Sequence, residues 1–224
     1  MSPALARTSI LAAMAVLAPE TALPARPLVT EDAPTVEEEK FELALGGDWA
    51  ATGEMHFDAC GTLKAGLLPR LDAGLSLPCG LGPDREGLGQ AQGTVKFRLL
   101  SLPPAAVALA TYWNFDGEWH REMAVLTLAF TRVILHFNGG VGTSLPARAS
   151  TVGVWGAAVD VPVAGPFCVA VEAYGAAGPG GGATGAGGIK VAALESLTLD
   201  LGGGGRIRGE APRYRATAGF TLLF

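Results

Sequence analysis

The chain has 224 residues, of which 32 are glycine and 49% are hydrophobic, and its formal net charge is −5. So high an apolar share excludes a disordered chain, and the weak negative charge gives no electrostatic basis for binding nucleic acid, which needs clustered lysine and arginine. After the N-terminal region no apolar run of about 20 residues occurs, so a helical membrane protein is excluded as well. A glycine-rich, apolar chain without such runs is typical of a transmembrane β-barrel, because only every second residue of its strands meets lipid.

The first element in chain order is a targeting signal. Arg7 precedes an apolar stretch at residues 10–18, and Pro19 and small residues then lead to Ala25. A positive charge, a short apolar core and small residues in this order are typical of a secretory signal peptide. We therefore expect residues 1–25 to be removed by cleavage after Ala25 and residues 26–224 to form an outer-membrane β-barrel. A retained membrane anchor is the alternative, and the short apolar core argues against it.

Twelve segments of the mature chain have the pattern of a β-strand. In six of them apolar side chains alternate with polar or small ones. These six are residues 40–46, 94–100, 132–138, 167–172, 196–201 and 213–224. Weaker candidates are residues 60–67, 71–77, 105–113, 122–130, 150–158 and 187–193. The sequence therefore predicts an all-β protein with twelve antiparallel strands.

The connections between these segments alternate between short and long. An even number of strands with short periplasmic turns and longer extracellular loops is the arrangement of a closed outer-membrane barrel. Closure also pairs every backbone N–H and C=O internally, as lipid requires. A soluble β-sandwich alternates too and is the competing interpretation, but its strands would need a shared dry core and more charge outside.

The three cysteines leave one pairing open. In an oxidising compartment Cys60 and Cys79 are a candidate disulfide, which leaves Cys168 alone. Strict alternation nevertheless places Cys60 and Cys79 on opposite faces of neighbouring strands, so a bond would require a bulge or a loop at the rim. The spacing of the cysteines matches no zinc pattern.

Four patches of the mature chain carry recognisable motifs. They are RPLVTEDA at 26–33 with KFEL at 40–43, GLLPRLDAG at 66–74, GLG at 87–89 with KFRL at 96–99, and PRYRATAGFTLLF at 212–224. In this order they resemble motifs of the meta-pathway phenol-degradation family of outer-membrane barrels. The resemblance implies a transporter-like or pore-like barrel in the outer membrane of a Gram-negative cell, and it supplies no ligand and no catalytic residue. Phe224 is also the usual terminal aromatic of the insertion signal, so the barrel assembly machinery is an expected partner of the last strand.

Motifs that would indicate an enzyme are weak. Residues 180–185 match a dinucleotide-binding fingerprint in letters, but no helix follows them and they lie within a glycine-rich stretch, so we expect no cofactor. His136 and Asn138 share one strand face, as in a barrel hydrolase, yet no serine motif accompanies them. We expect these two residues to line a polar lumen, and we expect neither catalysis nor a metal site.

The inward faces of the strands carry most of the charge. The candidate lumen-lining residues are Glu42, Lys64, Asp72, Lys96, Arg98, Arg132, His136, Glu172, Lys190, Asp200 and Arg215. They could pair with one another across the strands in a structural role, or they could form a charged path for small solutes. Strands such as 122–130 and 150–158 are small or apolar on both faces, which is compatible with passage of apolar compounds.

The sequence thus predicts a barrel that contacts outer-membrane lipid and acts as a passive channel or transporter for small compounds, hydrophobic or aromatic ones among them. A structural or adhesion barrel with a closed lumen is the alternative. Neither function involves nucleic acid.

Overall fold

The structure is a computed structural model that describes residues 28–51, 55–81, 87–117, 119–144, 150–178 and 181–224. The signal peptide predicted at residues 1–25 lies outside the described residues. Among the residues that are described, no helix is long and apolar enough to cross a membrane.

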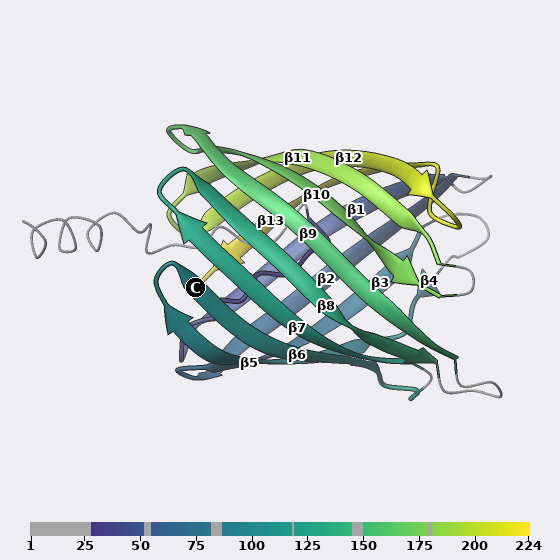
Figure 1. Cartoon of the computed structure of the whole chain (residues 1–224), viewed down its shortest axis with the longest axis horizontal. Coiled ribbons are helices and arrows are strands. Elements are labelled where there is room, and N and C mark those ends of the chain that lie inside the picture. Colours follow the sequence, from purple (N-terminus) through teal and green to yellow (C-terminus); the bar gives the residue numbers. More distant parts are fainter. Residues whose placement is uncertain (1–27, 52–54, 82–86, 118, 145–149, 179–180) are drawn as a thin grey trace, which may run out of the picture.

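The described strands form one antiparallel sheet that closes on itself into a tilted barrel (Figure 1). They are β1 (Phe41–Ala51), β2 (Met55–Leu68), β3 (Leu71–Gly80), β4 (Gly87–Leu88), β5 (Gln92–Leu102), β6 (Ala105–Asn114), β7 (Trp119–Phe130), β8 (Val133–Ser144), β9 (Ser150–Ala164), β10 (Phe167–Ala177), β11 (Ala183–Leu194), β12 (Leu197–Arg208) and β13 (Tyr214–Leu223). Each long strand pairs with its neighbour in sequence, and β1 pairs with β13 to complete the ring. The two-residue β4 pairs with the end of β3, next to the residues of β3 that pair with β5, and does not form a separate strand of the wall, which therefore has twelve strands.

The twelve-stranded barrel confirms the predicted fold class, while most strands run further toward the loops than predicted. Glycine-rich residues 202–205 were expected in a loop, yet they continue β12 and pair with β11 and β13. A run of glycines carries no alternation of side chains, so period-two analysis cannot detect a strand there, although the backbone pairs normally. We call the end with the two-residue turns the turn rim and the opposite end the loop rim.

The barrel is polar inside and apolar outside. Lys190, Asp72 and Asp160 are among the most deeply buried side chains of the described residues, each at most 1% exposed. On the outer face large apolar side chains such as Phe97 and Leu109 remain nearly half exposed. An apolar exterior around a polar interior suits a wall surrounded by lipid and excludes the competing soluble sandwich, whose core would be dry.

Residues 28–39 do not join the wall but run inside the barrel, and we call them the luminal segment. Ala33 of this segment is fully buried and packs against the small residues Ala108 and Ala110 of β6. Leu28 packs in the same way against Ala158 of β9 and Ala170 of β10. The lumen is therefore filled in part by the chain's own N-terminal region, for which the sequence predicted no structure.

Two glycines make room for the luminal segment. At Gly66, where the segment reaches the turn rim, an added Cβ would collide with the backbone carbonyl of Glu37, and Gly66 exchanges backbone hydrogen bonds with Glu39 and Lys40. At Gly156 on β9 an added Cβ would lie 2.8 Å from Oγ1 of Thr30. Only a residue without a side chain allows so close an approach of two chain segments.

The closed ring predicts a specific behaviour on denaturing gels. We expect the refolded protein to migrate at different apparent masses unboiled and boiled, because a ring with no free edge resists detergent until heat opens it. Identical migration of boiled and unboiled samples would contradict the barrel.

Candidate functional site

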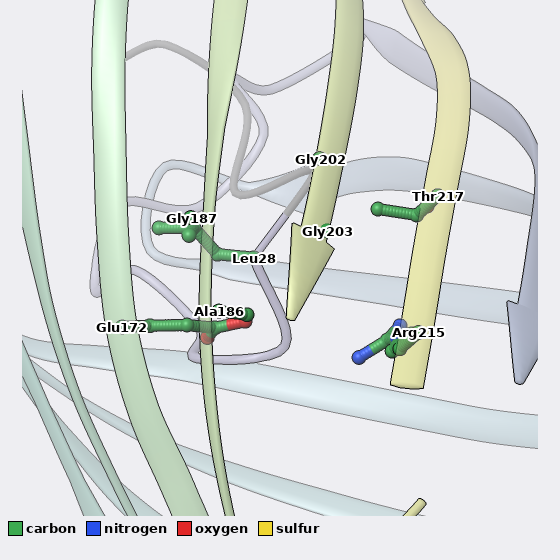
Figure 2. Close-up of a pocket in the computed structure, with 8 residues that line it drawn as sticks. All are labelled: Leu28, Glu172, Ala186, Gly187, Gly202, Gly203, Arg215 and Thr217. Carbon is green, nitrogen blue, oxygen red and sulfur yellow. The ribbon is translucent and has the colours of Figure 1, made fainter. Parts of the chain in front are cut away.

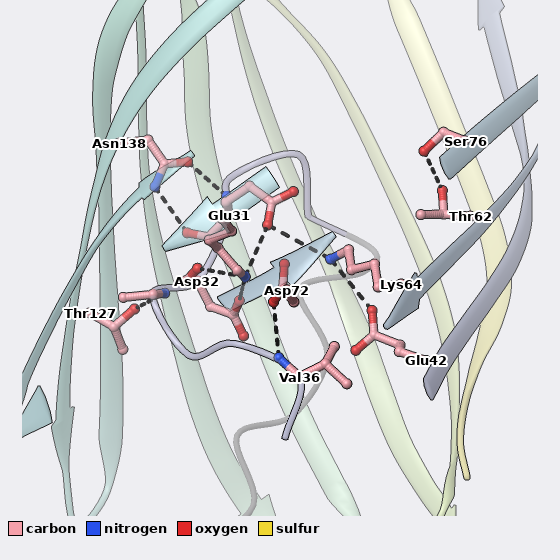
Figure 3. A network of polar contacts seen from close by, with 12 residues as sticks. Glu31, Asp32, Val36, Glu42, Thr62, Lys64, Asp72, Ser76, Thr127 and Asn138 are labelled. Atoms are coloured by element: carbon pink, nitrogen blue, oxygen red, sulfur yellow. Dashed lines mark hydrogen bonds and ion pairs between the residues drawn. The ribbon is translucent and has the colours of Figure 1, made fainter. Parts of the chain in front are cut away.

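The acidic residues of the luminal segment meet two lysines of the wall. Nζ of Lys96 on β5 lies 3.3 Å from Oδ1 of Asp32 and 3.8 Å from Oε2 of Glu31. Nζ of Lys64 on β2 lies 4.0 Å from Oε2 of Glu31 and 3.4 Å from Oε1 of Glu42 (Figure 3). In the low dielectric of the lumen an unpaired charge is costly. The carboxylates of the segment and the lysines of the wall therefore stabilise each other by neutralising their charges.

Side chains of the wall also bind the backbone of the luminal segment. Two oxygens of Glu172 on β10 accept hydrogen bonds from the N–H groups of Val29 and Thr30, each at 2.9 Å. Three more side chains of the wall accept hydrogen bonds from N–H groups of the segment: Asn138 Oδ1 from Glu31, Thr127 Oγ1 from Ala33, and Asp72 Oδ2 from Val36. Figure 3 shows Asn138, Thr127 and Asp72 around the segment, each with its dashed hydrogen bond. Because buried N–H groups must be paired, the wall takes the place of the secondary structure that the segment lacks.

A second series of polar side chains runs across neighbouring strands on the inner face of the wall. Nζ of Lys190 on β11 donates to Oδ2 of Asp160 on β9 at 2.7 Å, and Nε2 of His136 on β8 lies 3.6 Å from the same oxygen. Nδ1 of His136 is 3.0 Å from Oγ1 of Thr127, which in turn accepts the hydrogen bond from Ala33. The buried Lys190 is thus connected through four strands to the luminal segment.

Arg215 forms a separate bridge nearer the loop rim. Its guanidinium donates to Oδ1 of Asp48 on β1 at 2.8 Å and to the hydroxyl of Tyr174 on β10 at 2.7 Å. Arg215 and Glu172 line a narrow pocket with Leu28 and the glycines of β11 and β12 (Figure 2). The bridge from β13 to β10 passes over three intervening pairings of the sheet, so it spans part of the lumen.

The other candidate residues lie elsewhere. Arg98 donates to the carbonyl of Pro69 at 2.7 Å, at the turn rim. Arg132 was expected on a strand but lies exposed in the turn between β7 and β8, because β8 begins at Val133. Asp200 is buried on β12, opposite Lys190 in the strand register.

The cysteines are not bonded. Cys60, Cys79 and Cys168 all carry free thiols. In the register of β2 and β3, Ala59 rather than Cys60 stands opposite Cys79, so the two thiols lie on opposite faces of the sheet. Among the described residues no group of three or more His, Cys, Asp or Glu side chains could hold a metal ion.

Several residues of the lumen were missed from sequence. Asp160 was assigned to a connection between strands, and Arg121 to a loop, because both strands are longer than their alternation suggested. The luminal segment itself carries one usable signal, the acidic pair Glu31 and Asp32 in a chain whose predicted lumen-lining residues include more cations than anions.

Above the luminal segment, on the side of the loop rim, the lumen is hollow. A cavity of about 380 Å³ is bounded by Val29 and Thr30 of the segment, by Arg121 and Met123 of β7 and by residues of β8 to β11. Residues of the loop between β12 and β13, Glu210 among them, line it at the loop rim. The lumen therefore combines an occupied zone with a compartment of a size that fits a small solute.

Comparisons with known proteins agree on the fold. No family model and no curated protein sequence matches the chain. Among solved structures, the COG4313 outer membrane channel from Pseudomonas putida F1 superposes with a TM-score of 0.67 at 11% identity, over 86% of this chain and 98% of that one. The KdgM porin gives 0.66 at 5% identity (82% and 99% covered), and the NanC porin 0.64 at 11% (80% and 98%). The chain has the porin-like fold of an outer-membrane β-barrel.

Glu172 provides a test of how the segment is held. We expect Glu172→Gln to weaken docking by about 1–3 kcal/mol, because an amide NH₂ then faces N–H groups that need an acceptor. Hydrogen exchange of the amides of Val29 and Thr30, followed by mass spectrometry, should accelerate by about 10- to 100-fold. Glu195→Gln, in the exposed turn between β11 and β12, is the matched control and should change nothing. Equal exchange in both variants would show that Glu172 does not anchor the segment.

Glu31 makes docking sensitive to acid. Burial acts to raise the pKa of Glu31, but the charges of Lys64, Lys96 and Arg121 outweigh it and lower the pKa from 4.5 to about 2. A lowered pKa means that the carboxylate stabilises docking fully above pH 4.5 and that this contribution is lost as the pH falls through about 2.

We therefore expect acidification below pH 4.5 to release the segment, measured as a rise in single-channel conductance across a planar bilayer. Glu31→Gln lacks this titration, so its conductance should already be raised at pH 7 and should depend less on pH. A pH profile identical in the variant and the unmodified protein would exclude Glu31 as the responsive group.

Proposed function

We propose that the protein is a passive channel of the outer membrane for small compounds, including hydrophobic or aromatic ones. The observation that carries this proposal is the hollow lumen: a closed wall with a polar interior encloses a cavity of about 380 Å³ next to the loop rim. The solved structures of similar fold are porins and outer-membrane channels, and a structure of one of them, KdgM, is of a complex with oligogalacturonate. The motifs at residues 26–33 and 212–224 support membership of the meta-pathway phenol-degradation family.

In this proposal the luminal segment sets how far the channel is open. The bonds that hold it are hydrogen bonds and ion pairs to side chains, with no strand pairing beyond an isolated bridge between Glu38 and Gly66. Such contacts can be exchanged for water when the segment moves, whereas the wall keeps its own ladder. The lumen-lining charges, Lys64, Lys96 and Asp72 above all, then have a double role, since they bind the segment in one state and line a wet path in the other.

The turns and the cavity support one orientation of the barrel in the membrane. The turns are proposed to face the periplasm and the loops the exterior, so the cavity would open toward incoming solute. The C-terminal Phe224, whose backbone exchanges hydrogen bonds with Phe41, closes the ring at the turn rim and is the proposed contact for the barrel assembly machinery.

A structural or adhesion barrel is the second candidate, and the depth at which the luminal segment is held favours it. Ala33 is fully buried and Thr30 is 2% exposed, so the segment occupies the lumen tightly at these points.

Removal of residues 28–39 separates the two functions. We expect the refolded, full-length mature protein to give small or infrequent conductance steps in a planar bilayer, and the deletion variant to give larger and steadier ones because the lumen is cleared. Both preparations must first show heat-dependent mobility on gels. Absence of steps in both proteins would contradict a channel and support the structural barrel.

A further inference from the structure

The cations of the lumen differ in what neutralises them. Lys64, Lys96, Lys190 and Arg215 each have a carboxylate oxygen within 4.0 Å. Arg121 on β7 and Arg98 at the turn rim differ from these four, because no described carboxylate forms an ion pair with either, and of the two only Arg121 lines the cavity. Arg121 interacts with Glu31 electrostatically but forms no ion pair with it, and the ion-pair partners of Glu31 are Lys64 and Lys96.

Aromatic rings hold Arg121 in place. The guanidinium carbon lies 4.2 Å from the ring centroid of Tyr112 and 5.3 Å from that of Trp119. Cation–π contacts orient a guanidinium without occupying its N–H donors, and the buried Nε of Arg121 has no hydrogen-bond acceptor among the described residues. The side chain is thus oriented by its neighbours and still has donors to offer.

Those donors adjoin the cavity next to the loop rim, which Arg121 lines. Its other lining side chains include the apolar Val29, Met123 and Val154, and Val29 is 40% exposed although it lies within the barrel. The cavity has one further charged lining residue, Glu210, which is exposed at the loop rim. The compartment therefore presents one unpaired cation on its wall and apolar surface around it.

We propose that this cavity binds a small organic monocarboxylate with an apolar body, whose carboxylate is held by the guanidinium of Arg121. A carboxylate matches the planar donor fork of arginine and would accept hydrogen bonds from the terminal N–H groups of this half-buried side chain. The apolar body would cover Val29, which removes the exposed surface of that side chain from water. The negative charge of Glu210 at the loop rim disfavours dianions. The inference rests on the proposed function, because it names the class of solute that the channel takes up first.

Calorimetric titration of the refolded protein in detergent tests the site with benzoate as the probe. We expect Arg121→Gln to weaken benzoate binding at least tenfold, and Arg121→Lys, which keeps the charge without the fork, to weaken it less. Arg98→Gln, at the turn rim, is the matched control and should bind benzoate as the unmodified protein does. Heat-dependent gel mobility verifies that each variant is folded.

Two other probes test the two halves of the ligand. Benzyl alcohol lacks the charge and acetate lacks the apolar body, and we expect both to bind more weakly than benzoate. Benzoate binding that is equal in Arg121→Gln and the unmodified protein would overturn the assignment of the carboxylate to Arg121. If benzyl alcohol or acetate bound with the same affinity as benzoate, the proposed ligand class would be wrong.

The failure of this inference can be told apart from failure of the channel. If benzoate binds through Arg121 but neither the full-length protein nor the deletion variant conducts, the site stands and the channel is refuted. If both conduct and no benzoate binds, the channel stands and the site is refuted.

Discussion

The need to pair every backbone hydrogen bond without water determines the rest of this structure. A wall in lipid must close on itself, and closure turns one face of every strand toward a confined interior. Charged residues of the strands are then favoured on the inner face, where carboxylates and cations can neutralise one another. Lys190 with Asp160 and Lys96 with Asp32 are direct results of that constraint, as is the apolar belt on the outer face.

The luminal segment is subject to the same constraint, because its backbone N–H groups are also buried. Its own backbone has no ladder to join, so its N–H groups bind carboxylates, an amide and a hydroxyl of the wall. Polar groups of the wall and of the segment thus satisfy each other, and neither set would be stable in a dry lumen alone. The arrangement is therefore held together largely by mutual neutralisation, and the apolar contacts of Leu28 and Ala33 form two small clusters with residues of the wall.

Much of the barrel could be predicted from the sequence, and the limits of the prediction have physical causes. Apolar and polar side chains alternate clearly in six of the strands, and the other six were found as weaker candidates between them. Near the loop rim the alternation fades, so strand ends such as Arg121 on β7 and the glycines at residues 202–205 on β12 were assigned to loops. That a side chain such as Lys190 faces the lumen follows from the alternation of side chains along its strand. The partners of these residues do not, because a strand pattern contains no information about a non-repetitive segment that enters the lumen.

The anchoring of the luminal segment has a consequence for how the protein is assembled. Its hydrogen-bond acceptors come from β3, β7, β8 and β10, which are brought around one axis only when β1 meets β13 and the ring is complete. In an open, partly inserted sheet these acceptors would be spread along a curved ribbon and could not bind one short stretch of chain together. Docking of residues 28–39 therefore stabilises the closed ring relative to any form of the sheet in which a seam is still open.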